Sequence, residues 1–566
     1  MCRFLFLLLF SSISIGQENL ITSSYFEGFE IGNLGSPFSS YFPDFQKNNL
    51  EIKSDFMDIR LVENYKEYRF FDKIFFFSNS NIKNSLTYIS AYNEGGFINS
   101  QLTRPISNHS YINFYYNNLI SKGFFQFQEN RFSNLGFEYA YFNKNKPYSF
   151  TFYFNSINSF YEENGGVIDY NQDLSDDLQQ TYFSEANSEI KNRNFSLQQY
   201  YKFNSGKMIS YLIDYNRYRK VFTDNAPSSY HYSYTPLFFD IVDNYQNTSS
   251  FYHVKNELTL HSNYFLEKNI DFSFIYNLYY HDLITNNLGD FIFSISNFKN
   301  PLDYKYKFDL NFCLIGHNKN NYDLKLMYEL KTSKFNGQYL FGFNKQKPNL
   351  FSGIYPPNLL TNLSWEDDVY SLKNIYISFD NSIINRKIDL NFDYRKIHNL
   401  LYYNHYALYT QLESPVDYFH FLLQKKWVYK KLDFNQAIHL QKRYFDNDDN
   451  TNILSMPFFI FHQSIKYNLD LFKETKLMMN FDFKIHSNYF PNTYMPLSSI
   501  FYTQNEIKVG GIPFFSVGLY LQKNNFSLGL IFKDIQYAFL DRNYITQDYI
   551  ANPSILSLYI NWGFLD

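Results

Sequence analysis

The sequence predicts an all-β protein, and specifically a transmembrane antiparallel up-and-down β-barrel of about 18–22 strands. Three observations predict this fold class. The C-terminal segment alternates strictly between apolar and polar residues, similar segments recur along the 566 residues, and short connections alternate with long ones. Short turns at one end and long loops at the other are typical of outer-membrane barrels, whose turns face the periplasm and whose loops face outward.

The C-terminal segment Leu556–Asp566 is the clearest predicted strand, because every second side chain up to Phe564 is apolar. One face carries Leu556, Leu558, Ile560, Trp562 and Phe564. An apolar face that ends in two aromatic rings suits a strand that meets lipid, with the rings at the membrane interface. We therefore expect this strand to close the barrel, and we expect Ile560, Trp562 and Phe564 to form the signal that the insertion machinery reads.

Alternating segments of the same kind occur in the interior of the chain. Leu135–Asn143 and Tyr148–Asn155 form a predicted hairpin with Tyr and Phe on one face, and Ile388–Arg395 places polar residues at every second position. About ten residues is the length that a tilted membrane strand requires. A soluble β-sandwich also has one solvated face, but the chain shows no linkers between domains, and barrel closure would remove the exposed edges of these hairpins.

The connections between predicted strands fall into two classes. Short ones are expected at Asn204–Lys207, His317–Asn321, Ile384–Arg386, Trp427–Lys430, Phe472–Thr475 and Lys523–Asn525. Long polar ones are expected at Ser156–Asn194, Arg217–Ser250, His281–Asp303, Lys442–Met456 and Ser487–Gln504. The stretch Lys331–Leu372 can be read as one long loop or as an extra strand pair around Gln338–Asn344, so the strand number stays open within an even count.

The N-terminus predicts the cellular compartment. Arg3 precedes an apolar run, and the small residues Ser14 and Gly16 fit a cleavage site, so residues 1–16 are predicted to be a secretory signal peptide. Residues 17–79 lack regular alternation and are expected to form a periplasmic or lumen-inserted extension, and residues 80–566 the barrel. The mature chain keeps one cysteine, Cys313, which excludes an intramolecular disulfide. The expected location is the cell outer membrane of a Gram-negative bacterium.

Composition and charge exclude two classes of protein. The mean hydropathy is −0.39, and after the signal no apolar run reaches the roughly 20 residues of a transmembrane helix, which excludes a helical membrane protein. The net charge is −4 without a basic block, so nucleic-acid binding has no electrostatic support. The aromatic content of 22% carries little weight by itself, because the chain is also rich in Asn, Lys and Ile; the positions of the aromatic residues matter more.

The sequence offers no chemistry that predicts an enzyme, a cofactor or a metal. The 12 His residues show no His-Glu-x-x-His or Cys/His spacing, and there is no nucleophile elbow or phosphate loop. His439 and His486 fall on predicted inward faces with Asp433 and Asp482, and we interpret them as lumen-facing members of hydrogen-bond networks. The acidic stretch from Glu162 to Asp177 is interpreted as a solvated external loop, with cation binding as the less favoured alternative.

The predicted inward faces supply candidate pore-lining residues. They are Asp389, Asn391, Asp393, Arg395, Lys466, Asp470, Asp482 and Lys484. Acids and bases are mixed in this set, so strong selectivity for anions or cations does not follow. Solvation with cross-strand pairing is the simpler interpretation of each residue taken alone.

Several short motifs resemble the putative porin family of Bacteroidota-type outer membranes. They are Gly32–Pro37, Gly510–Pro513 with the strands after it, the pair Lys347–Pro348, and the terminal Trp562-Gly563-Phe564-Leu565-Asp566. The sequence departs from the family pattern at Pro357–Leu359, where Ser-Asn-His is usual. The resemblance spans the mature chain and implies an outer-membrane barrel that serves as a pore, without implying a particular solute.

Two functions are therefore expected to compete. The first is a porin through which small hydrophilic solutes or ions diffuse, and the second is a structural or partner-binding barrel whose lumen is plugged. An energised transporter is less favoured, because residues 17–79 are few for a folded plug domain. The expected partners are outer-membrane lipid, periplasmic chaperones and the barrel assembly machinery; a homo-oligomer or an envelope lipoprotein partner is left open.

Overall fold

A single large sheet of 22 strands forms the body of the protein. The computed structural model describes residues 84–90, 94–143, 145–203, 207–225, 245–265, 268–281, 288–299, 304–347, 371–405, 409–445, 455–472, 474–496 and 500–564. The predicted signal peptide 1–16 and extension 17–79 lie outside these residues. The strands of the sheet are β1 (Asn84–Ser90), β2 (Gly95–Ser107), β3 (Ser110–Ser121), β4 (Asn130–Tyr141), β5 (Tyr148–Glu162), β6 (Ala186–Lys202), β7 (Met208–Asp224), β8 (Tyr245–Phe265), β9 (Lys268–His281), β10 (Leu288–Lys299), β11 (Tyr304–Gly316), β12 (Tyr322–Lys331), β13 (Phe335–Gln346), β14 (Leu372–Ile383), β15 (Ile388–His398), β18 (Val416–Tyr429), β19 (Leu432–Phe445), β20 (Phe459–Phe472), β21 (Thr475–His486), β24 (Phe514–Lys523), β25 (Phe526–Lys533) and β28 (Ile555–Phe564).

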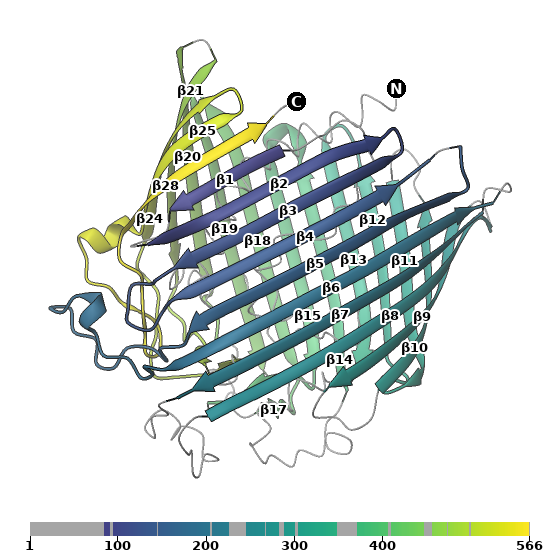
Figure 1. Ribbon diagram of the computed structural model, residues 1–566, viewed down its shortest axis with the longest axis horizontal. Coiled ribbons are helices and arrows are strands. Elements are labelled where there is room, and N and C mark those ends of the chain that lie inside the picture. Colours follow the sequence, from purple (N-terminus) through teal and green to yellow (C-terminus); the bar gives the residue numbers. More distant parts are fainter. Residues whose placement is uncertain are drawn as a thin grey trace.

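The sheet closes on itself. Each strand of the sheet pairs antiparallel with the strand that follows it along the chain. The first strand, β1, pairs with both β2 and the last strand, β28. At the closing seam Trp562 lies opposite Leu86, and the Thr87 hydroxyl donates a hydrogen bond of 3.1 Å to Asn561 Oδ1. Figure 1 shows the tilted strands wrapping into a barrel, with β28 beside β1. Closure pairs both edges of the sheet, which removes the exposed strand edges of an open sheet.

The two ends of the barrel differ in their connections. At one end, which we call the turn end, β1 begins, β28 ends, and all strand connections are short. The opposite end, which we call the loop end, carries every long connection. These are residues 163–185, 225–244, 347–371, 399–415, 446–458, 487–513 and 534–554. The predicted fold class, an antiparallel up-and-down barrel with short turns and long loops, is therefore confirmed, at the upper limit of the predicted strand number.

Small elements lie within the connections. The short strands are β16 (Leu401–Tyr403), β17 (Tyr409–Gln411), β22 (Thr493–Met495), β23 (Ile500–Tyr502), β26 (Tyr544–Thr546) and β27 (Tyr549–Ile550), and the 3-10 turns are η2 (Asp176–Leu178), η3 (Ile384–Arg386) and η5 (Ile535–Ala538). All except η3 belong to the loop end.

One predicted connection was wrong, and one stretch that the sequence left open differs from both of its readings. The segment His281–Asp303 contains β10, which pairs with β9 and β11 along its whole length, so it is not a long loop. One consequence is that the turn His317–Asn321 lies at the loop end although it is short. In Lys331–Leu372 the structure has the single strand β13 instead of a strand pair. Strands also extend further than predicted, because β5 and β6 occupy much of Ser156–Asn194.

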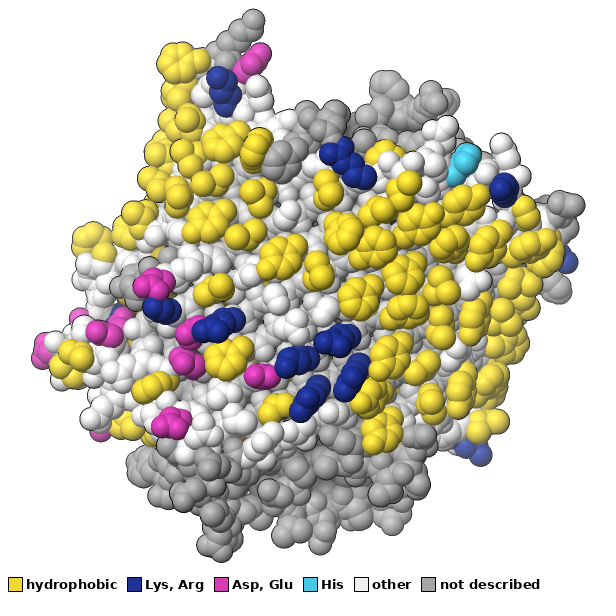
Figure 2. Space-filling model, viewed as in Figure 1, with side chains coloured by type: hydrophobic (Ala, Val, Ile, Leu, Met, Phe, Trp, Pro, Cys, Tyr) yellow, Lys and Arg dark blue, Asp and Glu magenta, His cyan; other side chains and the backbone are white. Residues whose placement is uncertain are grey.

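The outer wall is apolar and exposed. On β3 the side chains of Phe114 and Ile120 are 44% and 45% exposed, and the alternate residues Tyr115, Asn117 and Leu119 between them are buried on the inner face. Figure 2 shows the resulting apolar band across the face formed by the N-terminal half of the barrel. On β28 the side chains of Leu556, Leu558 and Trp562 are exposed on the same outer face, as the sequence predicted; the Phe564 side chain lies outside the description.

Inward side chains pack against one another where space is available. Gly136 on β4 is an example, because a Cβ atom there would lie only 1.8 Å from the Tyr115 ring. The Tyr115 ring therefore lies flat across β4 and reaches β5, where its hydroxyl is 2.8 Å from that of Tyr153 and shares a hydrogen bond with it. The wall is thus thickened from inside by aromatic side chains.

Candidate pore wall and external loops

The structure places all eight candidate pore-lining residues on the inner face. They are Asp389, Asn391, Asp393 and Arg395 on β15, Lys466 and Asp470 on β20, and Asp482 and Lys484 on β21. Their side chains alternate with outward ones, such as Phe392, whose ring stacks on that of Phe379 on the outer wall. The degree of burial varies: Asp393 is 2% exposed, whereas Asp470 is exposed near the turn end. Whether they line a conducting path remains a prediction.

Neighbouring strands pair these residues with amides and hydroxyls. Asn391 donates a hydrogen bond to Asp380 on β14. Ser464 on β20 donates one of 3.2 Å to Asn480 Oδ1 on β21, and Asp482 lies directly opposite Ser464 in the ladder. The polar inner face is therefore a cross-strand network.

A row of histidines joins the two halves of this network. We call Asp393, His420, His439, His462 and Asp482 the inner histidine row. His420 Nδ1 is 3.3 Å from Asp393, the rings of His420 and His439 stack at 5.8 Å, and His462 Nε2 is 3.6 Å from Asp482. The row crosses five consecutive strands, from β15 to β21.

Only Asp393, His439 and Asp482 of this row were predicted to face inward. His439 does point inward, as predicted, but its ring partner is His420. Asp482 is paired with His462, whereas His486 contacts the Ser487 carbonyl at 3.0 Å. The signal for the missed residue His420 was present, because it lies between two outward phenylalanines, Phe419 and Phe421, on an alternating strand.

Another part of the inner wall is apolar, and it begins at β24, the strand that pairs with β21. Nine inward side chains near the closing seam form one cluster, and each is at most 5% exposed. They are Ile89, Phe97, Leu119, Phe132, Tyr161, Ile190, Tyr520, Ile531 and Tyr559. We call them the inner apolar cluster. Between them and the turn end the inward amides of Asn113 and Asn117 are also buried, at 2% and 0% exposed. A wall facing only bulk water would leave such side chains largely accessible.

At the loop end, long connections from distant strands bind one another. Residues 163–185 contact residues 534–554 through the Val167 amide, which donates to the Asp548 carbonyl at 2.7 Å, and through the Tyr182 hydroxyl, which donates to Asp548 Oδ1 at 3.3 Å. Residues 487–513 join them, because the Thr546 hydroxyl donates to the Asn492 carbonyl at 3.0 Å. We call these three connections the loop cluster.

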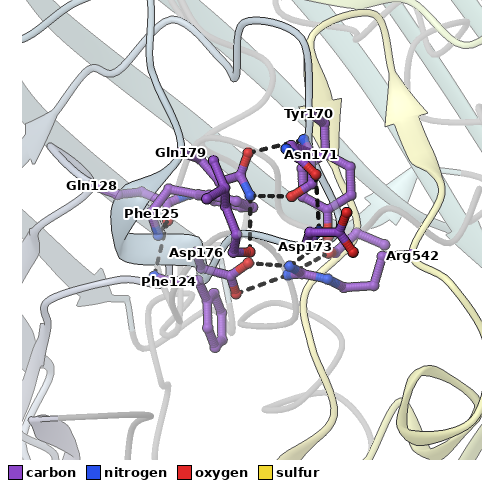
Figure 3. A network of polar contacts seen from close by, with 11 residues as sticks. Phe124, Phe125, Gln128, Tyr170, Asn171, Asp173, Asp176, Gln179 and Arg542 are labelled. Atoms are coloured by element: carbon purple, nitrogen blue, oxygen red, sulfur yellow. Dashed lines mark hydrogen bonds and ion pairs between the residues drawn. The ribbon is translucent and has the colours of Figure 1, made fainter.

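Arg542 is the central side chain of the loop cluster (Figure 3). Its guanidinium binds both carboxylate oxygens of Asp176, at 2.9 Å for Oδ2, and donates to the Tyr170 hydroxyl at 2.8 Å. It also lies 5.6 Å from the centre of the Phe125 ring, in the connection between β3 and β4. The Phe125 amide in turn donates to Gln128 Oε1 at 3.1 Å. One cation therefore holds three separate connections together.

A second acid of the predicted solvated stretch is buried. Glu163 is 4% exposed and accepts a hydrogen bond of 3.1 Å from the Tyr494 hydroxyl. Burial raises the pKa of Glu163, although the nearby charge of Lys220 and the hydrogen bond from Tyr494 oppose this effect. The interpretation of this acidic stretch as a uniformly solvated loop is therefore wrong, because Glu163 and Asp176 both have specific partners.

The described residues contain neither a membrane-spanning helix nor a metal-binding cluster of side chains. None of the helices in this part of the chain is long and apolar enough to cross a membrane. Within the same ranges, no group of three or more His, Cys, Asp or Glu side chains is arranged to hold a metal ion.

A closed antiparallel barrel with an exposed apolar outer wall, a largely polar inner wall, short turns at one end and long loops at the other is an outer-membrane β-barrel. The chain belongs to the family described as "Putative porin", whose model matches residues 11–566, so the resemblance seen in the sequence is confirmed. The fold and the family indicate the outer membrane of a Gram-negative bacterium, with the turn end in the periplasm.

Solved structures share the fold at low sequence identity. The ferric-catecholate import receptor Fiu of E. coli K12 matches with a TM-score of 0.60 and 9% identity, over 86% of this chain and 82% of the receptor. The FrpB iron transporter of Neisseria meningitidis matches with a TM-score of 0.60 and 10% identity, over 85% and 81%. The siderophore receptor PirA of Acinetobacter baumannii gives 0.58 and 9%, over 85% and 80%. No curated protein sequence matches.

Proposed function

We propose that the protein is a porin through which small hydrophilic solutes or ions diffuse passively across the outer membrane. The observation that carries the proposal is the polar inner face of β15–β21, where the eight candidate residues and the inner histidine row provide charges and hydrogen-bond partners for a hydrated solute. Selectivity in such pores comes from inward charges and from the loops at the mouth. Because acids and bases are mixed, we propose weak ion selectivity.

The loop cluster would set the width of the pore mouth. It contains three of the long external connections: Arg542 and a backbone hydrogen bond join 163–185 to 534–554, and side-chain hydrogen bonds join 487–513 to both. Loops fixed in this way restrict passage by size without consuming energy. We propose no catalytic reaction for this protein, because its sequence contains none of the catalytic motifs considered above.

A plugged barrel with a structural or partner-binding role is the second candidate. The inner apolar cluster and the fully buried Asn117 favour it, because a lumen filled with water would hydrate these side chains. The similar barrels of Fiu, FrpB and PirA belong to an import receptor, an iron transporter and a siderophore receptor, and barrels of 22 strands are commonly plugged.

Single-channel conductance in planar bilayers would separate the two functions. The mature chain from residue 17 and a chain that lacks residues 17–79 would be refolded and inserted, with heat-modifiable mobility in gels as the check of folding. Stable open steps from the longer chain are expected for the porin. Current that arises only in the shorter chain would favour the plugged barrel, and silence of both folded chains would contradict diffusion through this lumen.

A further inference from the structure

Four basic residues form a patch on the outer wall, where lipid-facing side chains are otherwise apolar. Lys191 and Arg193 on β6 lie directly opposite Arg219 and Arg217 on β7, and all four are exposed. We call them the basic patch. They share their strand face with Phe195, which is 37% exposed on the outer wall. Figure 2 shows the basic side chains gathered beside the apolar band.

The patch lies at one edge of the apolar band. Toward the turn end, the next outward pairs on the same two strands are apolar or aromatic: Phe195 with Tyr215, and Leu197 with Ile213. Toward the loop end, the next outward residue of β6 is Glu189. Because the loop end faces outward, this edge is at the level of the lipid headgroups of the outer leaflet.

The basic patch lacks enough negative charge of its own. Like charges placed directly opposite each other on a sheet destabilise it, and here two such rows adjoin. Among the described residues, the ion pairs of the patch are limited to Lys191 with Glu189, at 3.1 Å. Arg217 instead lies over the Tyr252 ring, 5.2 Å from its centre. Other basic residues of this barrel face do have carboxylate partners, for example Arg131 with Glu129.

The surroundings of the patch select the chemistry of a ligand. A guanidinium group binds phosphate through two parallel hydrogen bonds, and three arginines are present. Ser156 and Asn158 on β5 lie opposite Arg193 and Lys191 on the same outer face and supply neutral hydrogen-bond groups. The adjoining apolar wall at Phe195 would contact acyl chains. A free anion would use the charges but would gain nothing from that wall.

We propose that the basic patch binds the phosphorylated headgroup of an outer-leaflet lipid, with the acyl chains along the apolar wall of β6 and β7. The phosphate offsets the repulsion among the four cations, and the lipid gains a fixed position beside the barrel. This inference requires an outer-membrane barrel but does not depend on whether the lumen conducts, so conductance and lipid binding can fail separately.

Lipid binding would be measured by native mass spectrometry of the refolded mature protein in a neutral detergent. The probes are diphosphorylated lipid A, the same lipid without its phosphates, and inorganic phosphate as a competitor. We expect one phosphorylated lipid to be retained on the wild type. The variant R193Q/R217Q/R219Q should bind it roughly a hundredfold more weakly, since each basic residue near a membrane surface contributes about fivefold in affinity.

A matched control removes the same charge elsewhere. Lys202, Lys207 and Lys425 are exposed near the turn end, and K202Q/K207Q/K425Q should leave lipid affinity within about twofold of the wild type. If the triple arginine variant fails to fold, two other measurements test whether the basic patch binds the lipid phosphate. They are the affinity of the single variant R193Q and the comparison of phosphorylated with dephosphorylated lipid on the wild type. Equal binding of the two lipids, equal binding by the arginine variant, or full displacement by an equal concentration of inorganic phosphate would each overturn the proposal.

Discussion

Arg542 and Asp176 are the residues that most clearly connect distant parts of the chain. They lie 366 positions apart in the sequence and are only 11% and 18% exposed as side chains. No local pattern can predict such a pair, because it depends on how long loops meet after the barrel has closed. Asp176 was therefore interpreted as part of a solvated loop, while the inward direction of Asp393 followed from strand alternation alone.

Replacing Arg542 by Lys tests its role in the loop cluster. Lys keeps the charge but loses the two-pronged contact with Asp176 and the flat stacking over Phe125. We expect hydrogen exchange in residues 163–185 and 534–554 to accelerate about tenfold, which corresponds to about 1.4 kcal/mol. Arg131→Lys is the control, because that arginine is 63% exposed in a surface pair. Unchanged exchange in Arg542→Lys would show that the other contacts of the loop cluster hold the loops without the two-pronged contact of Arg542.

Asp548 gives the loop cluster a dependence on pH. Burial raises the pKa of Asp548 to about 6, although the hydrogen bond from Tyr182 lowers it. A carboxyl group whose pKa is raised in the folded state disfavours that state when ionised, so the cluster should gain stability as pH falls from 7 to 4. Asp548→Asn should reduce this gain, since Glu163 of the same cluster also has a raised pKa, and should stabilise the cluster by about 1–2 kcal/mol at pH 8. Local hydrogen exchange at several pH values would measure it; the same pH slope in both proteins would contradict the assignment.

At the level of the strands, the alternation of apolar and polar residues was sufficient to predict a strand where a recognisable turn bounds it. β4, β15 and β28 were found in this way, and β28 closes the barrel against β1. β10 was missed because polar and turn-forming residues flank it closely, with Asn286 and Asn287 before it and Asn300 and Pro301 after it. The strand β10 and the two connections that flank it were therefore interpreted together as one long loop, His281–Asp303. Pairing with β9 and β11, which supplies its stability, is not visible in a single sequence.

The terminal strand β28 provides the test at the level of one element. We predict that changing Trp562 and Phe564 to Asp abolishes membrane insertion. Trp562 lies on the outward face of β28 and Phe564 follows it two positions later, so each change removes an aromatic ring of the predicted insertion signal and adds a carboxylate that costs up to about 1 kcal/mol near the interface. Asn561→Asp is the matched control, since Asn561 faces inward and Asp can still accept the Thr87 hydrogen bond. If the double variant is still found in the membrane at normal levels and remains heat-modifiable, the outward face of β28 carries no insertion signal.

The whole molecule combines two unlike inner surfaces within one closed wall. The inner apolar cluster extends from β24 across the closing seam of β28 and β1 to β6. The charged network with the inner histidine row lies on the strands from β15 to β21. Closure, the positions of several loops and a range that includes the observed strand count were predictable, because they follow from repeated local patterns. The contrast between the two inner surfaces was not, because it depends on which strands become neighbours across the seam.

If solutes pass along the charged side of the lumen, ion selectivity should respond to charges there. The eight candidate residues include four acids and three bases, so a reversal potential near zero is expected in a gradient of potassium chloride. The variant D389N/D393N/D482N removes three of the acids, leaves a net positive wall, and should make the pore several-fold selective for chloride.

The control K191Q/R219Q changes charges of the outer wall and should leave the reversal potential unchanged. If the full-length chain is silent, the chain without residues 17–79 would be used. An unchanged reversal potential in the acid variant would mean that ions do not pass this side of the wall, and conduction would then have to follow the apolar side or bypass the barrel lumen.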